Sequence, residues 1–131
     1  MLRPVRRPLV ALLAVCAAVC GCGGPSDSEQ VHETVVAFQK ATAAKDYQQL
    51  CDKFFAPKVV EQVEAAGLPC EVALKKGLED VKSPTLTIGK IEVNGDKATA
   101  EVRSAAAGQP PSRDTLQLER VGDSWRIASL R

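Results

Sequence analysis

Side chains with clear potential for acid–base chemistry are few in this sequence. His32 is the only histidine. It flanks the apolar stripe of its predicted helix, so an exposed surface position is a simpler interpretation than a general base. Proton transfer needs a base within hydrogen-bond reach of the substrate, and no Asp or Glu lies at an inward position of the predicted strands, whose glutamates alternate outward. These outward residues are Glu92, Glu101 and Glu119.

Nucleophilic and metal-dependent chemistry also lack their residue patterns. Ser112 and Ser124 have no His or Lys partner at a recognisable spacing. The sequence has no Cys-x-x-Cys pair and no histidine cluster, which are the usual ligands of zinc and dithiol sites. No Gly-rich phosphate loop follows a predicted strand. We therefore expect no catalytic residue, no metal and no cofactor.

Residues 1–21 have the organisation of a secretory signal. A basic start precedes an apolar run over residues 9–19, which is shorter than the roughly 20 residues that span a bilayer. The stretch Val19-Cys20-Gly21-Cys22 then resembles the cleavage site of bacterial lipoproteins, in which a cysteine after a small residue receives a diacylglycerol. Cys22 is the predicted lipidated residue, and residues 22–26 would form a tether. The alternative is an ordinary cleaved signal with incidental cysteines.

The remaining cysteines are informative once this cleavage is assumed. Of five cysteines, Cys16 and Cys20 leave with the signal and Cys22 would carry the lipid. Cys51 and Cys70 are left as a single pair in an exported protein, where disulfides form readily. We predict a disulfide between them, with two buried free thiols as the alternative.

Charge and length limit the class of protein. Three of the 17 basic residues leave with the signal, so 14 basic residues face 16 acidic ones, a net charge of about −2. This balance argues against nucleic-acid binding and against polybasic attraction to a membrane. The rest of the chain suffices for one domain, predicted over residues 27–131. No second apolar stretch reaches transmembrane length, so the lipid on Cys22 would hold the protein to the membrane.

Helical periodicity predicts four helices before Pro84. The first begins at Ser26, which forms a capping box with Glu29, and ends near Lys45. Asp46 is the predicted cap of the second helix. Pro57 suits the first turn of the third helix and Gly67 its end, and a fourth runs over residues 72–81, weakened by Gly77.

From Thr85 onward, apolar residues recur at every second position, and this alternation predicts four strands in two hairpins. The first hairpin turns at Asn94-Gly95, with a bulge at Gly89-Lys90 that keeps its apolar residues on one face. Residues 105–112 are expected to form a loop or crossover, and the second hairpin turns at Gly122-Asp123. The expected pairs are Val93–Asp96, Ile91–Ala98, Ile88–Ala100, Leu86–Val102, Leu116–Ser129, Leu118–Ile127 and Arg120–Trp125.

Helices followed by strands indicate an α+β fold, with N-terminal helices packed on a curved four-stranded antiparallel sheet. Residues 27–130 resemble the nuclear-transport-factor-2-like cone fold of small actinobacterial lipoproteins. The resemblance rests on the capped first helix, Asp46-Tyr47, the hairpin over residues 93–98 and the Gly-Asp-Ser-Trp-Arg-Ile run at 122–127. It implies a conical cavity between helices and sheet. Some members are isomerases, cyclases or dehydratases, and others are binding domains, so fold alone does not identify the activity.

The predicted registers give a candidate pocket on the inner face of the sheet. It is apolar, with the Arg120 guanidinium, the Trp125 indole and the Ser129 hydroxyl as polar groups and no acid–base pair. We expect a protein at the extracytoplasmic face of the cell membrane that binds a small apolar ligand or an envelope protein. The alternatives are a ketosteroid-isomerase-like or cyclase-like enzyme and a purely structural envelope component. The candidate pocket residues are Tyr47, Leu116, Leu118, Arg120, Trp125 and Ile127.

Overall fold

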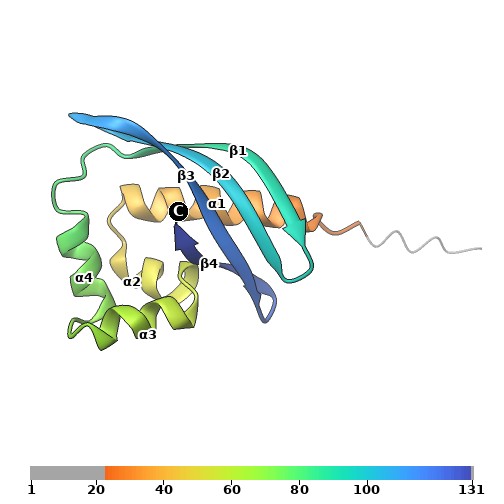
Figure 1. The fold of residues 1–131 in the computed structure, drawn as a ribbon, viewed down its shortest axis with the longest axis horizontal. Helices are drawn as coiled ribbons and strands as arrows, with labels where there is room; N and C mark the ends of the chain where they lie inside the picture. Colours follow the sequence, from red (N-terminus) through yellow and green to blue (C-terminus); the bar gives the residue numbers. More distant parts are fainter. Residues whose placement is uncertain (1–22, 131) are drawn as a thin grey trace, which may run out of the picture.

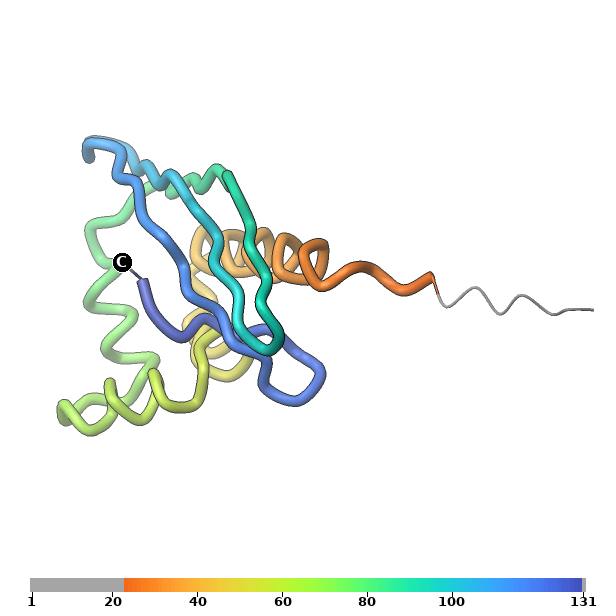
Figure 2. Tube along the Cα trace, turned by 45° about the vertical axis from the view of Figure 1, so that its right-hand side comes forward, coloured from red at the N-terminus to blue at the C-terminus, as the bar shows by residue number. Residues whose placement is uncertain are grey.

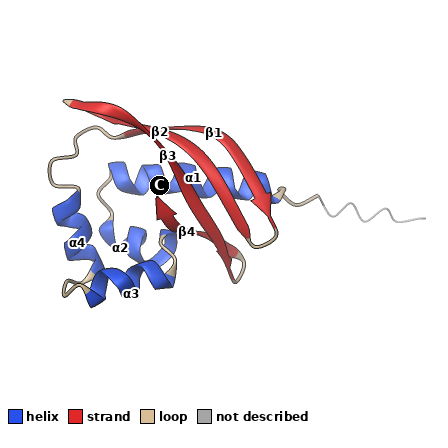
Figure 3. Cartoon of the chain, viewed as in Figure 1, coloured by secondary structure: helices blue, strands red, loops and turns tan. Residues whose placement is uncertain are grey.

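Helices occupy the first half of the described chain and strands the second, which confirms the α+β prediction (Figures 1 and 3). The structure, a computed structural model, describes residues 23–130. The predicted signal and the predicted lipidation site Cys22 lie outside this range. The helices are α1 (Asp27–Ala43), α2 (Tyr47–Gln49), the π-helix η1 (Leu50–Phe54), α3 (Pro57–Ala65) and α4 (Cys70–Gly77). The strands are β1 (Thr85–Asn94), β2 (Lys97–Ala106), β3 (Gln109–Val121) and β4 (Ser124–Leu130).

The predicted capping box forms at the start of α1. The backbone N–H of Glu29 donates to Ser26 Oγ over 3.2 Å, and the backbone N–H of Ser26 donates to Glu29 Oε2 over 2.7 Å. These bonds satisfy two N–H groups that a helix start otherwise leaves unpaired. They also lower the pKa of Glu29, first through the Ser26 backbone and second through its hydroxyl.

This lowered pKa predicts a pH-dependent contribution of Glu29 to stability. A lowered folded-state pKa stabilises the fold above the unfolded-state pKa, and the benefit is lost as pH falls through the folded-state value. Glu29→Ala should therefore destabilise the protein at neutral pH, and its difference from the parent should shrink in acid. Urea unfolding across this pH range measures the effect. Glu33→Ala is the control, because Glu33 is exposed and lies beyond the first turn of α1. Parallel pH profiles for the two variants would contradict the prediction.

Of the later helices, the third lies where it was predicted and the fourth ends earlier. Asp46 caps α2 as expected, accepting from the Gln49 backbone N–H over 3.1 Å. The chain then widens into η1, whose π-type turn closes with the Phe55 N–H donating to the Leu50 carbonyl. The helix α4 ends at Gly77 and does not continue to residue 81. Glycine has a low helix propensity, so an end at this position has a local physical reason.

The four strands form an antiparallel sheet in the order β1-β2-β3-β4. The predicted bulge is present between Ile88 and Ile91. The observed pairs of the first hairpin, however, are shifted by two residues from the predicted pairs. The turn residues are Gly95-Asp96, and Gly95 has φ +60°, which suits a glycine at the first position of a tight hairpin turn. A shift of two residues preserves the inward face, because side chains alternate with period two. The observed pairs are Val93–Ala98, Ile91–Ala100, Ile88–Val102 and Leu86–Ser104.

Residues 105–112 form no crossover, contrary to the prediction. The strands β2 and β3 continue toward a tight turn, and Pro110 and Pro111 belong to β3. Their pairing with β2 is interrupted by a register shift between Ser104 and Ala106. The partner strand β4 pairs with β3 only from Leu116 onward. Proline is tolerated here because the first part of β3 has a free edge and an irregular ladder.

The second hairpin confirms its predicted turn and two of its three predicted pairs. Leu118 pairs with Ile127 and Arg120 with Trp125. Leu116, however, pairs with Leu130 and not with Ser129, because the register shifts where β4 contains one extra residue. Such a bulge bends the strand and increases its twist.

The first helix lies across the inner face of the curved sheet (Figures 1 and 2). Val31 and Val35 of α1 are completely buried against that face. A second cluster joins the C-terminal part of α1 to α2 and η1 around Ala41, Leu50 and Phe54. The sheet residues of the main cluster are Ala98, Ala100, Val102, Leu116, Leu118, Trp125 and Ile127. Within the described range, no helix is long and apolar enough to cross a membrane.

Candidate functional site

A cavity of about 470 Å³ opens between the C-terminal half of α1, the β2–β3 hairpin and the end of β4. This volume lies within the usual range of small-molecule sites, about 300–1,000 Å³. Its walls are mainly apolar, so it favours a ligand with an apolar body. The principal apolar lining residues are Phe38, Phe55, Leu86, Val102, Leu116 and Ile127.

One carboxylate lines this cavity. Asp114 precedes Leu116 by two positions on β3 and pairs with Val102 of β2, so it lies on the inner face with them. Ser112 Oγ donates to Asp114 Oδ2 over 2.7 Å, and Ser104 Oγ lies 2.8 Å from Ser112 Oγ. Asp114 is half-buried. The site is therefore an apolar cavity with one anionic group held by a serine chain.

Asp114 corrects the expectation of a pocket without acidic residues. The alternation of Leu116, Asp114 and Ser112 along one strand was the available signal. It was missed because the predicted register of the second hairpin began at Leu116 and assigned no face to Asp114. Of the described residues that line the cavity, none beside this carboxylate is a histidine, tyrosine, lysine or glutamate. Among the described residues, no group of three or more metal-binding side chains gathers.

The predicted pocket is only partly the observed one. Leu116 and Ile127 line the cavity, whereas the other four candidates lie outside its lining. Leu118 is 2% exposed and Trp125 is 3% exposed, because α1 fills this end of the cone. Tyr47 packs on the cluster around Leu50. Side chains of the first helix thus close one end of the cone and leave the other end hollow.

Arg120, a candidate pocket residue, does not line the cavity and stacks on Trp125 across the sheet. Its guanidinium carbon lies 4.5 Å from the centre of the Trp125 ring, as the cross-strand pairing predicted. The same group donates to Asp27 Oδ1 over 2.6 Å and lies 3.6 Å from Asp96 Oδ1. Arg120 therefore joins β3 to the start of α1 and to the first hairpin turn. This arrangement indicates a structural clamp, not a ligand contact.

Replacement of Arg120 by methionine tests the clamp. Methionine keeps a long apolar stem but loses the cation, so we expect the free energy of unfolding to fall by about 1 kcal/mol. Urea unfolding followed by the fluorescence of Trp125, the only tryptophan, measures it. Arg103→Met is the matched control, because Arg103 is exposed. Equal stability of the two variants would contradict a clamp role for Arg120.

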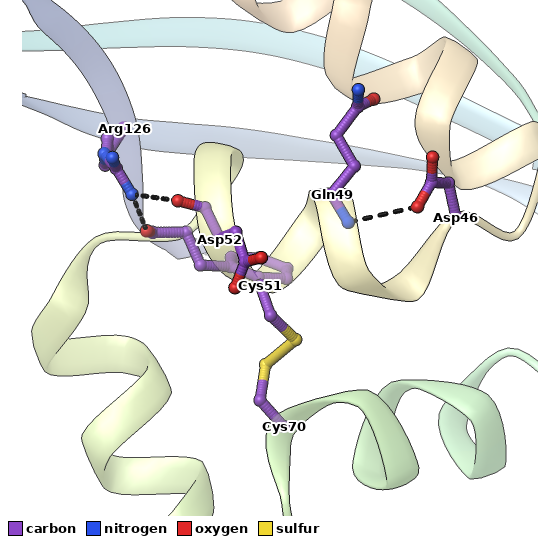
Figure 4. Close-up of a disulfide and its surroundings, with 7 residues drawn as sticks. Asp46, Gln49, Cys51, Asp52, Cys70 and Arg126 are labelled. Atoms are coloured by element: carbon purple, nitrogen blue, oxygen red, sulfur yellow. Dashed lines mark hydrogen bonds between the residues drawn. A yellow bond between two sulfur atoms is a disulfide. The ribbon is translucent and has the colours of Figure 1, made fainter.

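The predicted disulfide joins Cys51 of η1 to Cys70 at the start of α4 (Figure 4). Both cysteines are buried. On the other side of η1, Arg126 of β4 donates to the Asp52 carbonyl over 2.7 Å and to the Phe55 carbonyl over 3.4 Å. Figure 4 shows η1 held between these two connections. Phe55, which follows η1, lines the cavity, so these connections help to fix one of its walls.

Most of the other sequence candidates lie elsewhere. His32, Glu92 and Glu101 are exposed and do not line this cavity. Ser112 lines it, but its hydroxyl donates to Asp114, and Ser124 is exposed in the second hairpin. The residues that sequence reasoning missed are therefore Asp114 and Ser104, together with Phe38 and Phe55 of the helical wall.

Comparisons with known proteins show the fold. No protein-family model matches the chain, and no curated protein matches it. A SEC-C motif containing protein from Rhodopseudomonas palustris superposes with a TM-score of 0.59 at 14% identity, over 81% of this chain and 80% of that one. A nuclear-transport-factor-2-like protein of unknown function from Silicibacter pomeroyi has a TM-score of 0.55 at 20% identity, over 78% and 90%. A de novo designed protein with the same fold has a TM-score of 0.53 at 13% identity, over 81% and 87%.

The chain therefore has a nuclear-transport-factor-2-like fold, as the sequence resemblance implied. At these identities the likeness extends to architecture alone. The function must be argued from the cavity and its side chains.

Proposed function

We propose that this protein is a lipid-anchored extracytoplasmic binding protein whose cavity holds a small apolar ligand. The observation that carries the proposal is the cavity of about 470 Å³ with mainly apolar walls. A purely structural domain would gain by filling this space, because unfilled apolar volume forfeits packing energy. Retention of the space favours a ligand over a structural role.

A ligand is also favoured over an envelope protein as partner. Large contiguous apolar patches on a protein surface mark sites of protein–protein contact. On the described surface, the large apolar side chains that are exposed are Leu68, Val72 and Leu130. These are too few for such a patch, and the cavity offers more apolar contact.

The proposed anchor would place the cavity away from the bilayer. The tether enters α1 at Ser26, whereas the cavity contacts Phe38, Gln39 and Thr42 near the other end of that helix (Figure 1). A helix rises about 1.5 Å per residue, so the 17 residues of α1 span about 25 Å. This separation favours a ligand that arrives from the aqueous side of the envelope.

Binding is tested with the neutral fluorescent probe N-phenyl-1-naphthylamine. We expect saturable fluorescence enhancement with the parent protein. Ala106→Trp places an indole on the cavity wall and should weaken binding about tenfold or more. Ala107→Trp is the matched control, because the neighbouring Ala107 is exposed and outside the lining. Equal binding by both variants, with folding intact, would contradict a ligand role for the cavity.

The anchor is tested separately with the full chain in a bacterial host that processes lipoproteins. Cys22→Ala should remain unprocessed or move from the detergent phase to the aqueous phase, because the thiol that would carry the diacylglycerol is absent. Normal processing and membrane partition of this variant would overturn the anchor while leaving the ligand proposal intact.

The presence of Asp114 in the cavity lining supports one alternative function, an enzyme that uses this carboxylate as a base. Its position in a mainly apolar cavity would suit proton abstraction from a bound substrate. Turnover of a steroid-like or polyketide-like substrate, abolished in Asp114→Asn, would support that alternative. Binding without turnover supports the proposal above.

A further inference from the structure

The hydroxyl groups around the cavity present acceptors and few donors. Thr42 Oγ1 donates its proton to the Phe38 carbonyl over 2.9 Å. Ser129 Oγ, which was predicted to face the pocket, donates instead to Gln117 Oε1 over 2.8 Å, and Gln117 lies on the outer face between the inward Leu116 and Leu118. A hydroxyl has one proton and two lone pairs. Thr42 lines the cavity, and its hydroxyl can therefore offer a ligand only its lone pairs.

The hydroxyls of Ser104 and Ser112 also donate their protons within the protein and leave acceptors for a ligand. An ionised carboxylate only accepts, so Ser112 donates to Asp114. Ser112 then has no proton left, and Ser104 must be the donor in the contact between the two serines. The chain consequently runs from Ser104 through Ser112 to Asp114. What remains open to a ligand is the oxygen lone pairs of Ser104 and the carboxylate.

The charge of Asp114 has no internal counter-charge. In the described part of the chain, no lysine or arginine forms a salt bridge with it, and it is the only charged residue in the cavity lining. Arg103 of β2 and Arg113 of β3 are opposite each other in the strand register. Their side chains lie on the outer face of the sheet, because successive side chains along a strand point to opposite faces. Thr85 Oγ1 donates to the Ala105 carbonyl over 3.5 Å, so among the described side chains of the lining free donors remain on the amides of Gln39 and Gln109. The cavity is therefore complementary to a cation that carries several donors.

We propose that the ligand is a cationic amphiphile, an apolar body that ends in a primary amine. This inference rests on the proposed ligand-binding function and specifies its chemistry. The ammonium group has three N–H donors, which match the acceptors of Asp114 and Ser104. Charges that meet against apolar walls are less screened than in water. An anionic amphiphile of the same shape meets the uncompensated carboxylate and is disfavoured.

The test compares decylamine, decanol and decanoate, which share one apolar chain and differ in the head group. Each displaces the neutral probe from the full-length protein at neutral pH, below its aggregation concentration. We expect decylamine to bind about tenfold or more tighter than decanol, since hydrogen bonds to charged groups commonly have that effect. Decanoate should bind more weakly than decanol.

Asp114→Asn is the decisive variant, because it keeps the side-chain shape and removes the charge. It should abolish the preference for the amine and change decanol binding less than threefold. Asp123→Asn, which removes the same charge from the exposed turn of the second hairpin, should leave the preference intact. Ser112→Ala leaves the carboxylate without its positioning hydroxyl and should reduce the preference in part.

The outcomes separate this inference from the proposed function. If the neutral probe binds in the cavity but the parent protein shows no preference for the amine, the cationic ligand is overturned and the binding function stands. An unchanged preference in folded Asp114→Asn also overturns it. If neither the probe nor any of the three compounds binds, both proposals fail together.

Discussion

Leu118→Ala is expected to lower the free energy of unfolding by about 2–5 kcal/mol, the usual cost of truncating a buried leucine. Leu118 lies in the middle of the sheet, is 2% exposed and belongs to the cluster that α1 covers through Val31 and Val35. Truncation removes apolar contact and leaves a space that the surrounding strands cannot close. Urea unfolding followed by Trp125 fluorescence measures the loss.

The matched control for this change is Leu130→Ala. Leu130 lies on the adjacent strand β4 but is 63% exposed. Its truncation should change stability by less than about 1 kcal/mol, because little contact is lost. Comparable losses for the two leucines would show that the inner face of the sheet is not the principal core.

Removal of the Cys51–Cys70 disulfide is expected to destabilise the protein by about 3 kcal/mol. The two cysteines are 19 positions apart, and in the chain-entropy model a cross-link of about this span constrains the unfolded chain by that amount. The double variant Cys51→Ala/Cys70→Ala, compared with the oxidised parent by urea unfolding, gives the value. We also expect weaker binding of the neutral probe, because η1 leads into Phe55 at the cavity wall.

Reductant provides the control for the disulfide. It should lower the stability of the parent and leave the double variant unchanged. Intact-mass measurement after alkylation of the unreduced, denatured protein shows whether the bridge forms at all. Two alkylated thiols in that experiment would contradict the structure.

Local signals in the sequence were sufficient for the order of elements and for much of the sheet. Ser26 with Glu29 and Asp46 with Gln49 indicated helix starts, because a capping side chain acts on backbone within three residues of itself. The bulge before Ile91 followed from a change in apolar parity, since one face of a strand must stay buried. The turn at Gly122-Asp123 and the pairing of Arg120 with Trp125 were also correct.

The first hairpin turns at Gly95-Asp96 and not at Asn94-Gly95, so its pairs differ from the predicted ones by two residues. Two other parts of the sheet exceeded what local patterns decide. Pro110 and Pro111 suggested a loop, yet they belong to β3, where one edge lacks a partner. The extra residue in β4 shifts the partner of Leu116 to Leu130. Both features depend on where a neighbouring strand ends, which no single segment specifies.

The sequence by itself determined the α+β class, the capped first helix and the two hairpins, because each depends on near neighbours in the chain. It also indicated the disulfide, because Cys51 and Cys70 are the pair left once the predicted signal and Cys22 are set aside. Only the tertiary structure decided where the cone is hollow. The side chains of α1 fill the space around Leu118 and Trp125 and leave the space beside Asp114 open. Packing in three dimensions thus places Arg120 between β3, α1 and the first hairpin turn, where it acts as a clamp. It also places Asp114 in the cavity lining as the charged group of the site. Filling of a cavity depends on the combined volume of side chains from distant segments, and no local pattern encodes that sum.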